Sequence, residues 1–271
     1  MVNQLFPYYG GKQNLANIIL PLFPKHIQYV EPFVGGGSIF FAKRPSDNEV
    51  LNDFDEKITN FYRVAKHPDK FKELQILIQG TLHSESDYLK SRDILKKFKA
   101  SDSDVELAWA LWCQCQLTFS HIIYGGFAFG ETGMGRGTAN KRDNFTEKLL
   151  ERLRTTEIFQ RDAVELILLK DSPNTFFYCD PPYVSSNCGH YKGYTTKNFT
   201  KLLNVLSAIK GKFLLSSYRE EILLKYRDKY KWISKDIQQN VSVTGKRNNK
   251  KIKIECLTMN YQCPQTTIKL F

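Results

Sequence analysis

Short apolar runs that end at a glycine or an acidic residue alternate with segments of helical spacing near the start of the chain. Residues 28–34, QYVEPFV, predict a buried strand closed by three glycines, and residues 49–52 predict a second strand that ends at Asp53. After Asp53 the apolar residues recur with helical spacing. This order of strand, turn, helix and strand is typical of an α/β unit with a parallel sheet.

The same alternation returns after residue 155. EIFQRDAVELI predicts a strand and the start of a helix, TFFYC a strand, FTKLLNVLSAIKG a helix and KFLLSSY another strand. The last two predicted strands flank the basic turn KRNNK and form a hairpin. The expected fold class is therefore α/β, with a mixed, mostly parallel sheet that ends in an antiparallel hairpin.

The middle of the chain has a different pattern. Residues 67–80 and 85–99 predict surface helices, and residues 104–119 predict a buried one. Residues 124–144 contain several glycines and cations but almost no large aliphatic side chains, which predicts a long loop or a twisted hairpin. We therefore expect an α/β part, an inserted and mainly helical domain, and a second α/β part, with the limits 1–62, 63–155 and 156–271.

Acidic residues stand at or just after several of the predicted strands, namely Glu31, Asp53, Asp162 and Asp180. A single acid in such a place can be a helix cap. Several acids on the carboxyl edge of one parallel sheet, with three glycines beside the first, instead favour a ligand cleft.

The residues of this predicted cleft argue against a phosphate-binding loop. The G-K-[ST] ending is missing, and the acids would repel phosphates. A ligand with hydroxyl groups and positive charge fits better, and S-adenosylmethionine has a ribose diol, a sulfonium and an ammonium group. By its position one strand beyond the glycines, Asp53 can accept hydrogen bonds from the ribose hydroxyls.

Composition adds a preference for a polyanionic partner. Lys and Arg number 39 and Asp and Glu 28, so the formal net charge is +11. Nucleic acid, an anionic membrane surface and a merely basic, solvated surface are all compatible with this surplus. No signal-peptide pattern and no apolar stretch of about 18 residues is present, so we expect a cytoplasmic protein that does not cross a membrane. The six cysteines lack paired metal-ligand spacing, and Cys113 and Cys115 are expected to be core thiols.

The stretch FFYCDPPYV, residues 176–184, ends a predicted core strand with a carboxylate, two prolines and an aromatic ring. The prolines donate no hydrogen bond and stiffen the loop, so Asp180 and the carbonyl of Pro181 present acceptors only. Two acceptors on the exocyclic amine of adenine would favour a pyramidal nitrogen with a localised lone pair. Tyr183 offers a face on which an extruded base can stack. The alternative is an ordinary Asp-Pro turn followed by a packed tyrosine.

Five segments of the chain resemble, in this order, motifs of the Dam-type family of DNA adenine-N6 methyltransferases, in the class whose cofactor motifs precede the catalytic one. The segments are YYGGK at 8–12, EPFVGGGS at 31–38, NDF at 52–54, DA at 162–163 and DPPY at 180–183. The resemblance implies a Rossmann-like methyltransferase fold with an inserted target-recognition domain. It gives the catalytic role to Asp180, Pro181, Pro182 and Tyr183. It gives cofactor binding to Tyr8, Gly10, Gly11, Lys12, Glu31, Pro32, Phe33, Gly35, Gly37, Ser38, Asp53, Phe54, Asp162, Ala163 and Asp180.

The function implied by the resemblance is site-specific transfer of a methyl group from S-adenosylmethionine to N6 of adenine in double-stranded DNA. We expect a monomer, and we expect no metal ion, because the sulfonium already makes the methyl group electrophilic. A cognate restriction endonuclease is a further expected partner, while the solitary, phage or restriction role stays open. An RNA adenine methyltransferase and a non-catalytic DNA-binding module with a relic pocket stay open as alternatives. A cytosine-N4 enzyme is disfavoured, because that group usually resembles Ser where Asp180 stands.

Two departures from the family pattern matter. Tyr8 stands where the family often has Trp, and the middle region matches only in general type. Since that region selects the DNA site in the family, the recognition sequence stays open, with GATC as one option.

Polar and basic residues near the predicted pocket are candidates for contact with DNA. Arg pairs well with guanine and Asn with adenine in the major groove, whereas cations on turns more often meet phosphates. The alternative is a set of solvated charged loops. The DNA-binding candidates are Arg136, Asn140, Lys141, Arg142, Lys192, Lys246 and Arg247.

Overall fold

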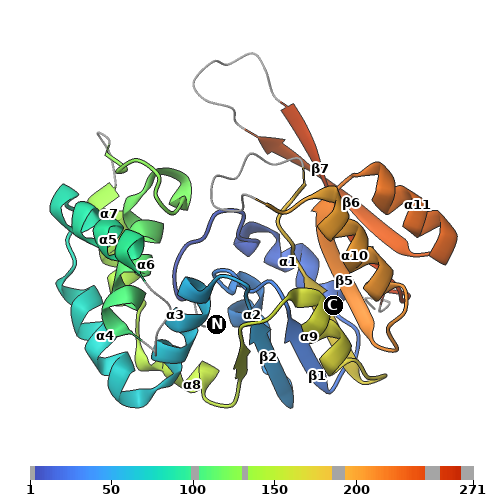
Figure 1. The fold of residues 1–271 in the computed structure, drawn as a ribbon, viewed down its shortest axis with the longest axis horizontal. Coiled ribbons are helices and arrows are strands. Elements are labelled where there is room, and N and C mark those ends of the chain that lie inside the picture. Colours follow the sequence, from blue (N-terminus) through green and yellow to red (C-terminus); the bar gives the residue numbers. More distant parts are fainter. Residues whose placement is uncertain (1–3, 99–103, 130–133, 185–192, 242–250, 264–271) are drawn as a thin grey trace, which may run out of the picture. The chain divides into compact units, whose positions relative to one another are not determined.

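The computed structural model describes residues 4–98, 104–129, 134–184, 193–241 and 251–263 (Figure 1). The chain forms two compact units and passes between them several times. The first unit consists of Met1–Ala16, Val34–Pro45 and Glu49–Arg161. The second consists of Asn17–Phe33, Ser46–Asn48 and Asp162–Phe271. The predicted domain limits at residues 63 and 155 stay a prediction.

The first unit is mainly helical. Its two strands, β2 (Asn48–Asn52) and β3 (Glu157–Phe159), pair in parallel. Its helices are η1 (Gln13–Leu15), α2 (Ser38–Ala42), α3 (Glu56–Lys66), α4 (Pro68–Gly80), α5 (Glu85–Lys97), α6 (Val105–Leu117), η3 (Phe119–His121), α7 (Met134–Asp143) and α8 (Glu147–Leu153).

Helix α6 forms the centre of the helical part of this unit. It contacts α3, α4 and α5, and side chains all around it are buried. A helix that is apolar on every side needs neighbours on every side, so the buried helix predicted for residues 104–119 is confirmed. Cys113 and Cys115 lie on it as fully buried free thiols, as predicted.

The prediction of a loop or hairpin for residues 124–144 is wrong for its second half, which forms α7. Two glycines among ten residues give this segment a low intrinsic helix propensity. Tertiary hydrogen bonds stabilise the helix instead. The hydroxyl of Thr138 lies 2.8 Å from Nδ1 of His83, and Nη1 of Arg142 donates to the carbonyl of Thr81 at 2.7 Å.

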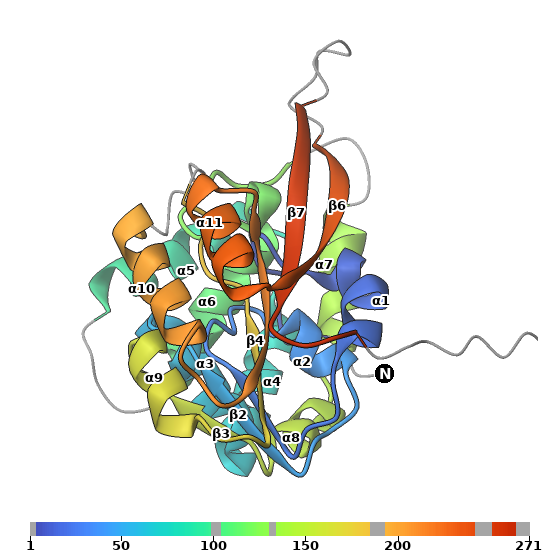
Figure 2. The ribbon, with the colours of Figure 1, turned by 90° about the vertical axis from the view of Figure 1, so that its right-hand side faces the viewer.

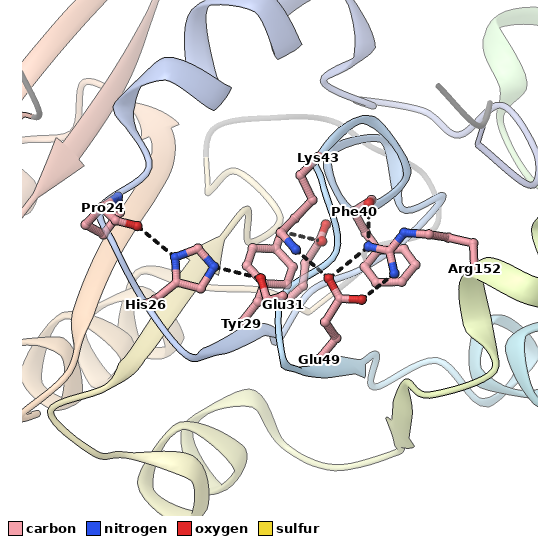
Figure 3. A network of polar contacts seen from close by, with 9 residues as sticks. Pro24, His26, Tyr29, Glu31, Phe40, Lys43, Glu49 and Arg152 are labelled. Atoms are coloured by element: carbon pink, nitrogen blue, oxygen red, sulfur yellow. Dashed lines mark hydrogen bonds and ion pairs between the residues drawn. The ribbon is translucent and has the colours of Figure 1, made fainter. Parts of the chain in front are cut away.

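A buried ion cluster joins three elements of the first unit. Glu49 on β2 accepts hydrogen bonds from Lys43, which follows α2, and from Arg152 on α8 (Figure 3). Arg152 also donates to the carbonyl of Phe40 at 3.1 Å. Burial alone would raise the pKa of Glu49, but its bonds with Arg152 and Lys43 more than offset burial, so this pKa lies below its ordinary value.

The second unit is built on a mixed sheet with the strand order β1-β4-β5-β7-β6. Strands β1 (Gln28–Glu31), β4 (Thr175–Cys179) and β5 (Lys212–Tyr218) are parallel. The hairpin of β6 (Ile233–Val241) and β7 (Lys251–Met259) adds to β5 in antiparallel orientation (Figure 2). The predicted mostly parallel sheet with an antiparallel end is therefore confirmed.

The helices of the second unit pack beside its strands, and α10 lies between α9 and α11 (Figure 1). All five residues of β4 are buried, which explains its continuous apolar sequence. Each helix of the described residues is too short or too polar to traverse a lipid bilayer. The helices of this unit are α1 (Ala16–Ile19), η2 (Leu20–Leu22), α9 (Ala163–Lys170), α10 (Thr196–Leu206) and α11 (Glu221–Tyr230). The sequence analysis did not predict α11.

Candidate active site

The glycine turn that precedes α2 is packed directly against two tyrosines of the first unit. Gly35 and Gly37 have φ of +47° and +67°, a region that residues with a Cβ rarely adopt. A Cβ on Gly35 would lie 2.9 Å from the Tyr8 ring, and one on Gly37 would lie 2.5 Å from the Tyr62 hydroxyl. That hydroxyl donates to the carbonyl of Gly35 at 3.0 Å. The turn therefore needs glycine both for its backbone and for its neighbours.

Asp53 joins the end of β2 to this turn. Its side chain is buried, and its Oδ2 accepts a hydrogen bond from the Gly35 amide at 3.0 Å. Its Oδ1 accepts from the Asp55 amide at 3.0 Å. Burial raises the pKa of Asp53 to about 6, although these backbone bonds act in the opposite direction. A carboxylate oxygen can accept more than one hydrogen bond, so Asp53 can still accept hydrogen bonds from hydroxyl groups of a ligand.

The predicted N-terminal motif lies against the same turn. The amide of Lys12 donates to Oγ of Ser38, and Nζ of Lys12 donates to the carbonyl of Gly10, both at 3.0 Å. The amide of Gly11 donates to the carbonyl of Tyr8 at 3.0 Å. The structure thus brings the cofactor-binding candidates of the first unit together.

Phe54 completes this group of residues. Its side chain is 79% exposed although it directly follows the buried Asp53. An exposed aromatic ring beside a carboxylate fits a nucleoside, whose base has a flat face and whose ribose has two hydroxyls.

Two acids stand at one edge of the sheet in the second unit. Glu31 ends β1 and Asp180 follows β4, and these strands are parallel neighbours. Glu31 is buried and accepts a hydrogen bond from the Tyr29 hydroxyl at 2.7 Å (Figure 3). Burial, together with the charges of Asp180, Glu31 and Glu255, raises the pKa of the Tyr178 hydroxyl. Two of the four acids that the sequence predicts at the strand ends, Glu31 and Asp180, therefore stand at this edge.

The DPPY segment leaves β4 without entering a helix or strand. The hydroxyl of Tyr183 lies 3.3 Å from Oδ1 of Asp180 and donates to a carboxylate oxygen of Glu255 on β7. Its ring centre lies 4.2 Å from that of Tyr218, with the planes at 62°. Both prolines, Tyr183 and Phe199 help to line a small pocket.

A family model described as D12 class N6 adenine-specific DNA methyltransferase matches residues 8–254. The chain belongs to this family. This finding confirms the predicted adenine-specific DNA methyltransferase.

Curated proteins similar to this D12 chain are methyltransferases. The type II methyltransferase M1.LlaDCHI of Lactococcus lactis subsp. cremoris is 27% identical over 202 residues, covering 70% of this chain and 69% of its own. M.MjaIII of Methanocaldococcus jannaschii is 26% identical over 219 residues, covering 73% and 75%. A DNA adenine methylase of Vibrio cholerae serotype O1 is 27% identical over 209 residues, covering 70% and 69%.

Among solved structures, a precorrin-6y C5,15-methyltransferase from Geobacter metallireducens aligns with 94% of the D12 chain and 93% of its own chain. The identity is 9% and the TM-score is 0.42, values too low to support any inference about this chain.

The remaining cofactor-binding candidates of the D12 chain lie in the second unit. Asp162 caps α9, since its Oδ1 accepts hydrogen bonds from the amides of Val164 at 2.9 Å and Glu165 at 3.3 Å. Capping alone accounts for an acid at this position, so its role toward a cofactor stays a prediction. Ala163 and Pro32 are buried, and Phe33 is half-buried.

The DNA-binding candidates of the D12 chain differ in exposure. Arg136 and Asn140 are exposed on α7, whereas Lys141 and Arg142 on the same helix are half-buried. Burial lowers the pKa of Lys141, and the guanidinium of Arg142 is bonded to the Thr81 carbonyl. The other three candidates lie outside the described residues, namely Lys192, Lys246 and Arg247.

The sequence analysis missed several residues that contact the motifs of the D12 chain. Tyr62 donates to the glycine turn, while Ser216 and Glu255 surround the Tyr183 hydroxyl. Glu255 is the one acid in the apolar run IECLTM, and this isolated charge in a predicted strand was the available signal.

Proposed function

We propose that S-adenosylmethionine is the methyl donor of this chain and that its target is adenine in double-stranded DNA. Membership of the D12 family supports a methyl donor and a DNA substrate. When bound, this donor supplies an electrophilic methyl group on a sulfonium. The roles of individual residues that follow are part of the proposal.

The observation that carries the proposal is the buried carboxylate of Asp53, bonded to the Gly35 amide at 3.0 Å and followed by the exposed Phe54. Asp53 would accept hydrogen bonds from the ribose hydroxyls of the donor, and the Phe54 ring would cover its adenine. The glycine turn and the Tyr8–Lys12 segment would form the backbone frame of this site. The role of Glu31 in cofactor binding stays a prediction.

Asp180 and Pro181 would bind the exocyclic amine of the target adenine. The Asp180 carboxylate and the Pro181 carbonyl are both acceptors, and Pro182 has no N–H to donate. Acceptors directed at the amine stabilise the positive charge that grows on N6 as the methyl bond forms. Tyr183 would stack on the extruded base, which offsets part of the few kcal/mol that leaving the duplex costs.

Arg136 and Asn140 on α7 would contact base edges in the DNA site, since both side chains are exposed. We further propose that the chain is a monomer and that it has a cognate restriction endonuclease. Sedimentation of the purified chain with and without duplex DNA tests the first.

The reaction is tested by incubating the purified chain with S-adenosylmethionine that carries a radiolabelled methyl group. Duplex DNA and structured RNA serve as separate substrates, and the products are digested to nucleosides and separated. The proposal requires label in N6-methyldeoxyadenosine. Label in the RNA alone, or in a cytosine derivative, would contradict it.

A further inference from the structure

A hydrogen-bonded network surrounds the Tyr183 hydroxyl within the second unit. Glu255 on β7 stands directly opposite Tyr218 on β5 in the antiparallel pair. Because side chains alternate along a strand, Ser216 lies on the same face of the sheet as Tyr218 and Glu255. The Tyr183 ring packs on Tyr218, which brings its hydroxyl to this face.

The Tyr183 hydroxyl has one proton, and side-chain oxygen atoms of three described residues lie near it. It lies 3.3 Å from Oδ1 of Asp180, 3.2 Å from Oγ of Ser216, and closer still to Oε1 of Glu255. A hydroxyl donates a single hydrogen bond, and a carboxylate at short distance is the strongest acceptor. The proton of Tyr183 is therefore directed to Glu255 and not to Asp180.

Glu255 is held in place for this contact. Its side chain is 2% exposed, and the same Oε1 also accepts a hydrogen bond from Ser216. A buried carboxylate requires such donors. Burial and the charges of Asp180 and Glu255 raise the pKa of Tyr183, so its hydroxyl keeps its proton and remains a donor.

We propose that Glu255 is a positioning residue for methyl transfer, which binds the Tyr183 proton and so keeps the acceptor capacity of Asp180 for the adenine amine. The inference rests on the proposed function, in which Asp180 binds that amine and Tyr183 stacks on the base. Without the Glu255 carboxylate, the Tyr183 hydroxyl would donate to Asp180 and compete with the substrate. The hydrogen bond between Tyr183 and Glu255 also fixes the rotation of the tyrosine ring.

A double-mutant cycle between Glu255 and Tyr183 tests this role. Glu255→Gln should lower kcat for DNA methylation by roughly tenfold, because a neutral amide holds the Tyr183 proton less strongly than a carboxylate does and the hydroxyl then donates to Asp180. KM for DNA and the affinity for S-adenosylmethionine should stay within twofold. In the Tyr183→Phe background no hydroxyl proton remains, so Glu255→Gln should lower kcat by less than twofold. Glu255→Asp should restore part of the rate.

Glu221→Gln, which makes the same chemical change at an exposed acid on α11, is the matched control and should leave kcat unchanged. If Glu255→Gln fails to fold, Glu255→Asp is measured in its place, and its smaller loss of kcat should likewise disappear in the Tyr183→Phe background. A wild-type kcat in the Glu255 variant overturns the inference, as does an equal fold-loss in both backgrounds, which a purely structural role would give. Absence of methyl transfer by the wild-type chain would instead refute the proposed function.

Discussion

The Asp53 carboxylate accepts a hydrogen bond from the Gly35 amide at 3.0 Å, so the acid at the end of β2 and the glycine turn form one structure. The two residues are 18 positions apart in the sequence. Each depends on the other, because the Gly35 amide of the turn is one of the donors that stabilise this buried carboxylate. A ligand with hydroxyl groups would donate further hydrogen bonds to the buried Asp53 carboxylate and stabilise it.

This relationship predicts a pH-dependent affinity for S-adenosylmethionine. The ribose hydroxyls donate to ionised Asp53, whose pKa is raised to about 6 by burial. Affinity should therefore fall as the pH drops through 6 and be roughly tenfold weaker at pH 5 than at pH 7. Calorimetric titration measures it. Asp53→Asn should bind more weakly at pH 7 and show little pH dependence, and an unchanged pH dependence in that variant would exclude Asp53 as its source.

The same pKa has a consequence for stability. Because the pKa of folded Asp53 exceeds that of the unfolded chain, its contribution is full below the unfolded pKa and is lost as the pH rises through about 6. Asp53→Asn should therefore destabilise the ligand-free chain less at pH 8 than at pH 5. Urea unfolding at the two pH values measures this difference, and the opposite order would be inconsistent with an Asp53 pKa raised by burial.

Replacing Gly37 should destabilise the first unit. Its φ of +67° costs about 1–2 kcal/mol for a residue with a Cβ, and Gly37→Ala also places that atom 2.5 Å from the Tyr62 hydroxyl. The free energy of unfolding should fall by at least this amount, together with the affinity for S-adenosylmethionine. Gly137→Ala on α7 is the control, since a Cβ there meets nothing within 4 Å. Equal stability of the two variants would mean that the turn adapts.

Breaking the ion cluster should destabilise the first unit strongly. Arg152→Met leaves Glu49 with one cation fewer, and loss of one partner of a buried ion pair costs roughly 3–5 kcal/mol. Because the pKa of folded Glu49 is lowered, its stabilisation is present above the unfolded pKa and is lost as the pH falls through the folded pKa. Denaturant unfolding at neutral pH and near pH 4 measures both effects. Glu151→Gln, in an exposed pair with Arg154, should change stability by about 1 kcal/mol or less.

Two arginines on α7 should behave differently when replaced by alanine. Arg142→Ala removes a hydrogen bond to the Thr81 carbonyl and should lower stability by about 1–3 kcal/mol. Arg136→Ala changes an exposed residue and should leave stability intact while altering DNA affinity or site choice. Thermal unfolding and DNA binding at fixed salt separate the two. If Arg136→Ala methylates the same sites at the same rate, Arg136 does not contact the DNA site.

Local patterns predict much of this fold. Strand β4 has a continuous apolar run, and α6 is apolar on every side. Such sequences are stable only when they are buried, so both elements could be assigned to the core from the sequence. Helix α7 was not predicted, because its glycines lower the intrinsic helix propensity of the segment. Hydrogen bonds to Thr81 and His83 stabilise the helix instead.

The motifs could be recognised in the sequence, but the residues that contact them could not. Asp53 and Asp180 stand out as acids after apolar strands, whereas Glu255 reaches Tyr183 across 72 positions of sequence. The pairing of β4 with β5 and of β5 with β7 brings that contact about, and no local spacing encodes it.

Modification-sensitive sequencing of DNA from cells that express the chain, beside cells that express Asp180→Ala, tests the central claim most directly. If Asp180 presents an acceptor to the adenine amine, wild-type cells should carry N6-methyladenine at a defined sequence and the variant cells should carry none there. Purified Asp180→Ala should still bind S-adenosylmethionine through Asp53 and the glycine turn, so that the loss of methylation is not a loss of the cofactor. Equal methylation in both cultures, or none in either, would contradict the account.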